Sequence, residues 1–69
     1  MEVKYTRHAI VDSMPDEKIS EQEVERVIRK AEFREKISEN KYKFRYSDVE
    51  VICVKTPEHW LIVTCYRVR

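Results

Sequence analysis

The C-terminal run, residues 60–69, constrains the fold more than any other stretch of the chain; it reads Trp-Leu-Ile-Val-Thr-Cys-Tyr-Arg-Val-Arg. Its first seven residues are β-branched, aromatic or otherwise apolar on both alternating faces, and only the tail is basic. Such a pattern is typical of a strand that is covered on both sides. We therefore expect a central strand here, and the rest of the chain must supply the strands that pair with it and the helices that cover it.

Length and composition set the limits on function. With 69 residues, the chain forms one domain over residues 1–69 and buries roughly 60% of its unfolded surface, so any active site should be a surface groove. The chain has no Gly, which excludes the Gly-rich loops that cradle nucleotide phosphates. Its start has no apolar signal region, and no apolar run approaches the ~18 residues of a membrane span. We expect a soluble, cytoplasmic protein without a nucleotide cofactor.

The two cysteines, Cys53 and Cys65, lie in apolar strand contexts, where a free Cys is usually a small buried hydrophobe. A disulfide between neighbouring strands is conceivable, but one residue of turn length decides whether the two share a face. Together with His8 and His59 they contain no close-spaced pair of zinc ligands. We expect two reduced thiols, no metal and no other cofactor.

The net charge of +1 hides an asymmetry along the chain. Residues 1–40 carry 8 basic and 10 acidic side chains, whereas residues 41–69 carry 6 basic and 3 acidic ones. A positive C-terminal half is compatible with a polyanion such as RNA, and also with an ordinary solvated surface. Charged residues reach 39% and the only amides are Gln22 and Asn40. This composition resembles that of proteins from thermophiles.

The N-terminal half predicts a short strand and two helices. Glu2–Tyr5 alternates polar and apolar residues, as a strand does. Thr6 can cap a first helix, which we expect Pro15 to end. Ser20 and Glu23 form the S-x-x-E capping box of a second helix. The apolar stripe of that helix follows the spacing i, i+3, i+4, i+7 and consists of Val24, Val27, Ile28 and Ala31.

From Phe33 onward the apolar period is two, which indicates strands. The expected strands are 33–37, 41–46, 49–55 and 60–67. We therefore predict an α+β domain with two helices packed on one face of a three- to four-stranded antiparallel sheet. Tyr42, Phe44 and Tyr46 share one strand face; they could stack on bases, but such a stripe is more often core, and core is our prediction for Phe44.

Four short motifs carry a family resemblance: Thr6-Arg7-His8-Ala9, Ile19-Ser20-Glu21-Gln22-Glu23-Val24, Arg45-Tyr46 and Thr64-Cys65-Tyr66-Arg67. Together they resemble small RelE-superfamily domains, above all a group of unknown function with a Thr-x-x-His-Ala opening, and more distantly BrnT-type toxins. The resemblance implies two helices on a sheet and, as in the toxin members, a metal-independent endoribonuclease of toxin-antitoxin type. Its expected partners are RNA and an antitoxin-like protein; a second copy could also complete so small a core.

Metal-free RNA cleavage needs a base, cations that stabilise the phosphorane, and an acid. The resemblance makes His8 the candidate base, Arg45 the phosphate clamp, and Tyr66 the acid or the residue that orients the base. The further cations expected to hold RNA are Lys41, Lys43, Arg67 and Arg69. Each also has a structural interpretation, as a packed ring or as a solvated outer face. The competing function is a non-catalytic RNA- or protein-binding module on the same fold.

Overall fold

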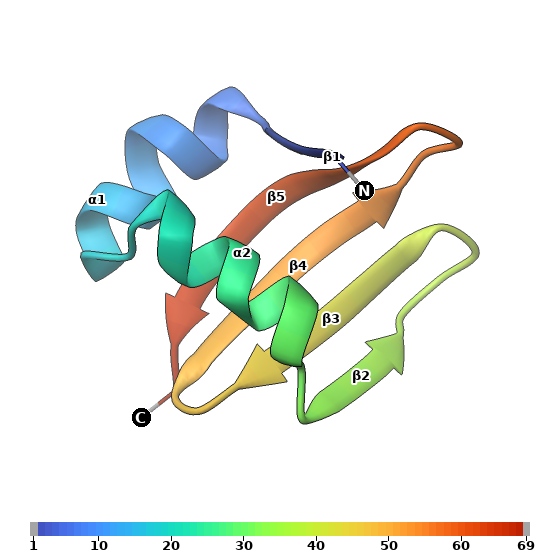
Figure 1. Ribbon diagram of the computed structural model, residues 1–69. Coiled ribbons are helices and arrows are strands. Elements are labelled where there is room, and N and C mark those ends of the chain that lie inside the picture. The colour runs from blue at the N-terminus through green and yellow to red at the C-terminus, as the bar shows by residue number, and fades with distance from the viewer. Residues whose placement is uncertain (1, 69) are drawn as a thin grey trace.

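The computed structural model describes residues 2–68, which form one α+β unit of helices and a single sheet (Figure 1). The elements in chain order are β1 (Glu2–Tyr5), η1 (Ala9–Ser13), α1 (Met14–Glu17), α2 (Glu21–Lys30), β2 (Phe33–Lys36), β3 (Lys41–Tyr46), β4 (Val49–Lys55) and β5 (His59–Arg67). Among the residues described, no helix has the length and apolar character needed to cross a membrane.

The sheet has five strands in the order β1-β5-β4-β3-β2 and is mixed. β1 pairs parallel with β5, with Glu2 opposite His59 and Tyr5 opposite Ile62, while the other three pairings are antiparallel. The prediction of three to four antiparallel strands was therefore wrong in number and in pairing. The helices and strands β2, β3 and β4 lie between β1 and β5 in the sequence, so no hairpin connects the two strands. The alternation of residues within a strand does not indicate which distant strand it pairs with.

β5 was predicted to be the central strand; it is paired on both sides, with β1 and with β4, but the middle strand of the five is β4. Its pairing with β4 contains a bulge: Ile52 lies opposite Thr64 but Cys53 lies opposite Ile62, so Val63 is the extra residue. The Thr6 hydroxyl donates to the Val63 carbonyl at 3.2 Å and accepts the Ala9 N–H at 3.1 Å. Thr6 thus caps the first helix, as predicted, and fastens that helix to the bulged strand.

The first helical segment runs on to Glu17, so the prediction that Pro15 ends it was wrong. Proline has no N–H and its ring clashes with the carbonyl four residues earlier, so a regular α-helix is disfavoured there. The chain widens instead into the π-turn η1, in which the Met14 N–H donates to the Ala9 carbonyl, and continues as α1. The segment ends at Lys18, which adopts the left-handed conformation with φ 56°.

α2 starts with the predicted capping box, since the Glu23 N–H donates to the Ser20 hydroxyl and the Ser20 N–H to the Glu23 carboxylate. Val24 and Val27 are buried against the sheet, and Ile28 packs partly buried beside them. The core between the helices and the sheet also contains Ala9, Met14, Ile19, Phe44, Val49, Val51, Cys53, Ile62 and Cys65. All helices lie on this one side of the sheet, as Figure 1 shows.

Two isoleucines allow a matched test of this core. Ile62 is 0% exposed on β5, whereas Ile37 is 46% exposed after β2. We expect Ile62→Ala to lower the free energy of unfolding by about 2–5 kcal/mol and Ile62→Val by about 0.5–1.5 kcal/mol, because each leaves a cavity. Ile37→Ala should change it by less than about 0.5 kcal/mol. Urea denaturation measures all three, and equal losses at the two positions would contradict the placement of β5.

Candidate functional site

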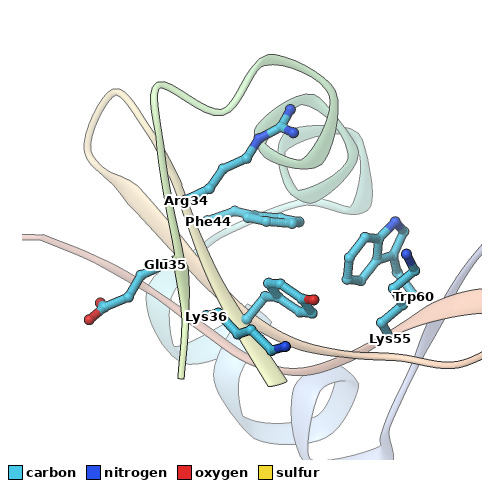
Figure 2. A pocket seen from close by; sticks show the side chains of 7 residues that line it. Arg34, Glu35, Lys36, Phe44, Lys55 and Trp60 are labelled. Carbon is cyan, nitrogen blue, oxygen red and sulfur yellow. The ribbon is translucent and has the colours of Figure 1, made fainter. Parts of the chain in front are cut away.

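A concave surface lies on the helix side of the sheet, where β2 ends and β3 and β5 begin. Figure 1 shows that no helix covers this corner of the sheet. We call it the aromatic hollow; it has a volume of about 320 Å³ and is lined by Arg34, Glu35, Lys36, Tyr42, Phe44, Lys55 and Trp60 (Figure 2). It is a surface groove, the only kind of site that a chain of this size was expected to offer.

Three aromatic rings form the floor and one wall of the aromatic hollow. Trp60 meets Tyr42 edge-on, with centroids 5.5 Å apart at 89°, and meets Phe44 at 5.2 Å and 72°. Phe44 is 4% exposed and belongs to the core, as predicted. Tyr42 and Trp60 are only partly buried, so they pack on the core with one side and reach solvent with the other. Such rings can hold a flat ligand without losing their own packing.

Each aromatic ring has a cation directly opposite on the neighbouring strand. The register pairs Arg34 with Phe44 and Lys36 with Tyr42 across β2 and β3. The Arg34 guanidinium lies 5.5 Å from the centroid of the Phe44 ring.

The third such pair joins β4 to β5, where Lys55 lies opposite Trp60. Its ammonium group lies 5.8 Å from the centroid of the Trp60 ring. Glu35 points away from the hollow in Figure 2 and pairs with Lys43 at 3.6 Å. The hollow therefore combines aromatic surface with three cations.

Two of the three predicted catalytic residues lie together on the opposite, helix-free face of the sheet. Arg45, Glu50 and Tyr66 are direct cross-strand neighbours. The Tyr66 hydroxyl donates to the Glu50 carboxylate at 2.7 Å, and the Arg45 guanidinium lies 3.9 Å from the same carboxylate. The hydrogen bond to Glu50, with burial second, raises the pKa of Tyr66 to about 12. Since this favours the neutral phenol in the folded state, its contribution to stability is complete below pH 10 and is lost as the pH rises toward 12.

His8, the predicted base, is not near this row. It lies before η1 in the helix layer, its ring is exposed, and its Nδ1 is 3.2 Å from the Asp12 carboxylate. The adjacent residue Ala9 is buried in the core on the helix side of the sheet. The sheet therefore separates His8 from Arg45 and Tyr66, and the structure does not bring the three together.

The cations predicted to hold RNA divide into two groups. Lys41 and Lys43 lie on β3 beside Arg45, on the helix-free face, and Lys43 pairs with Glu35. Arg67 is instead used within the fold, because its guanidinium donates to the Glu17 and Lys18 carbonyls and pairs with two carboxylates. Arg69 lies outside the described residues.

Sequence reasoning missed the cations of the aromatic hollow, Arg34, Lys36 and Lys55, and placed Trp60 only within a strand. The available signal was the aromatic stripe of Tyr42 and Phe44 next to a strand with basic residues at positions two apart. That signal becomes a site only when the register puts cations and rings opposite one another, and a shift of one residue would move them to opposite faces.

Cys53 and Cys65 are buried free thiols. Burial raises the pKa of Cys53 to about 12 and is the main cause that raises the pKa of Cys65 to about 11, so both remain protonated and unreactive at neutral pH. In the register Cys53 lies opposite Ile62 and Cys65 opposite Val51. Within residues 2–68, no group of three His, Cys, Asp or Glu side chains is placed to hold a metal ion.

These features define an α+β domain with helices on one face of a five-stranded mixed sheet and an aromatic, cation-lined groove beside them. No protein-family model, curated protein or solved structure matches the chain. The resemblance to small RelE-superfamily domains thus stays a prediction that rests on the four sequence motifs.

The hydrogen bond between Tyr66 and Glu50 can be tested by titration. Glu50→Ala should lower the pKa of Tyr66 from about 12 toward its ordinary value of 10, because the acceptor and its charge are lost. Tyr5 is the internal control: burial, followed by Glu25 and Glu21, raises its pKa to about 12, and the substitution should leave it there. NMR titration of isotopically labelled tyrosine rings reports both residues, and an unchanged Tyr66 would refute the bond.

Proposed function

We propose that this domain binds single-stranded RNA without cleaving it, with a base held in the aromatic hollow. The observation that carries the proposal is the set of three cross-strand pairs that place Arg34, Lys36 and Lys55 opposite aromatic rings. Of those rings, Tyr42 and Trp60 are open to solvent on one side. This corresponds to the second of the two functions expected from the sequence, an RNA-binding module.

The chemistry of the aromatic hollow suits a single strand better than a duplex. A base can stack on an aromatic ring only when it is unpaired and splayed out, and each stacked base contributes about 1–3 kcal/mol. The cations around the rings can hold the phosphates on either side of that base, by bidentate contact in the case of Arg34. Recognition through ring faces and phosphates depends little on sequence, so we expect broad rather than base-specific binding.

The same geometry speaks against cleavage. A 2′-hydroxyl and its phosphate must reach the base and the phosphate clamp together, but His8 and Arg45 lie on different sides of the sheet. Glu50 also lies between Arg45 and Tyr66, where it accepts a hydrogen bond from the Tyr66 hydroxyl and forms an ion pair with Arg45. A carboxylate at that point places negative charge where a ribonuclease must stabilise the anionic phosphorane.

RNA binding can be followed through Trp60, the single tryptophan of the chain. We expect single-stranded RNA to quench its fluorescence, with an affinity that falls steeply as salt rises. Tyr42→Leu should weaken binding by about 1–3 kcal/mol through lost stacking. Lys36→Ala and Lys55→Ala should each weaken it for all sequences and reduce the slope of log K against log salt by about 1.

Lys4→Ala is the matched control, because Lys4 is exposed on β1 with its neighbour Leu61 on the helix-free face. It should leave the affinity and the salt slope unchanged. Equal effects of Lys4→Ala and Lys55→Ala would mean that the charge of the whole chain, rather than the aromatic hollow, attracts RNA. An absence of salt-sensitive quenching of Trp60 would overturn the proposal.

The ribonuclease prediction is tested in the same protein. We expect RNA incubated with the wild-type chain in a chelator to stay intact, and expression of the chain in cells not to slow growth. Cleavage that is lost in His8→Ala, Arg45→Ala and Tyr66→Phe, with each variant still folded, would instead establish the enzyme. Only in that case would an antitoxin-like partner be expected.

A further inference from the structure

A second groove lies between the first helical segment and the start of α2. It has a volume of about 490 Å³ and is lined by Ile10, Met14, Pro15, Lys18, Ile19, Ser20 and Glu21. Ile10 is 49% exposed and its neighbour Val11 is 54% exposed. These are two of the four large apolar side chains that are exposed in the described part of the chain, and the other two, Phe33 and Ile37, lie in or next to β2. We call this groove, together with the adjoining exposed residues Val11 and Asp16, the helical groove.

The π-turn explains why apolar residues face outward here. In η1 the inward positions are Ala9 and Ser13, followed by Met14, and all three are buried. Ile10 and Val11 therefore occupy the outer side of the turn. A π-turn has poorer backbone geometry than an α-helix and recurs at functional sites. The exposure of Ile10 and Val11 on the outer side of this turn suggests that another molecule covers them.

The surroundings of the helical groove are acidic. Residues 10–25 contain six acidic side chains and one basic one, Lys18. Glu17 and Glu23 contact Arg67, whereas Glu21 lines the groove and Asp16 is exposed beside Pro15. RNA would be repelled from this surface, because it would meet negative charge. The lining itself carries one basic residue, Lys18, and one acidic residue, Glu21. A ligand that is apolar on one side and cationic where it faces Asp16 and Glu21 complements this surface.

We propose that the helical groove docks a cationic amphipathic helix of a partner protein. A helix that presents aliphatic residues at i, i+3, i+4 and i+7 can cover Ile10 and Val11, and its Lys or Arg side chains can reach Asp16 and Glu21. A second copy of this chain does not offer such a helix, since the apolar stripe of α2 is buried in its own core. The helical groove shares no lining residue with the aromatic hollow, so the two surfaces can act independently.

Labelled synthetic peptides and fluorescence anisotropy test the proposal on the whole chain. The probe is a helix-forming peptide of Leu and Lys with Leu at i, i+3, i+4 and i+7. Its two matched controls are a scrambled peptide of the same composition, and a peptide with the same Leu stripe and Glu in place of Lys. The probe should bind at least about tenfold more tightly than either control, because only it matches both the apolar stripe and the charge.

Variants assign the binding to the helical groove. The double variant Ile10→Ser/Val11→Ser should weaken binding of the probe by about tenfold or more, and Asp16→Asn/Glu21→Gln should weaken it and reduce its salt dependence. Phe33→Ser is the matched control, since Phe33 is 48% exposed on β2. It should leave binding unchanged.

Two results would overturn the proposal. Equal binding of the scrambled or acidic peptide would show that the groove does not select a cationic amphipathic helix. Concentration-dependent dimerisation in sedimentation, abolished by Ile10→Ser/Val11→Ser, would assign the groove to a second copy of the chain instead.

Discussion

The position of the helices on the sheet depends on Arg67, near the end of β5. Its guanidinium donates to the carbonyls of Glu17 and Lys18, where α1 ends, and pairs with Glu23 of α2 and with Asp48 before β4. Hydrogen bonds to charged groups contribute about 1.5–3 kcal/mol each, and leaving such carboxylates without a partner costs more when they are partly buried. A single side chain thus joins both helical segments to two strands, and this role occupies the donors that RNA would need.

Because the chain has no glycine, a residue with a Cβ must adopt the left-handed conformation at the bend between α1 and α2. A helix that ends in the left-handed conformation usually uses Gly, but here Lys18 takes φ 56°, which costs about 1–2 kcal/mol for a residue with a Cβ. The Arg67 guanidinium bonds the carbonyl of that residue at 3.0 Å and offsets part of the cost. The bend between α1 and α2 is therefore held by a residue at the other end of the chain.

Local signals in the sequence predicted most elements, because a capping box or a period-two stripe is complete within a few residues. Ser20 with Glu23 gave the start of α2, and the alternation of residues 41–46 and 49–55 gave β3 and β4. The parallel partner of β1, the π-turn before Pro15 and the aromatic hollow depend on register and distant packing. Cross-strand pairs such as Lys55 and Trp60 cannot be deduced from either strand alone.

The pairing of β1 with β5 also determines the order in which the domain can be completed. β1 leaves the ribosome well before its hydrogen-bonding partner, residues 59–62, is synthesised. Contacts of such long sequence separation require closure of nearly the whole chain, which slows folding. Until that closure, the edge of β1 and its apolar residues Val3 and Tyr5 remain without their partner strand. The nascent chain therefore cannot finish its sheet until residues 59–62 have left the ribosome.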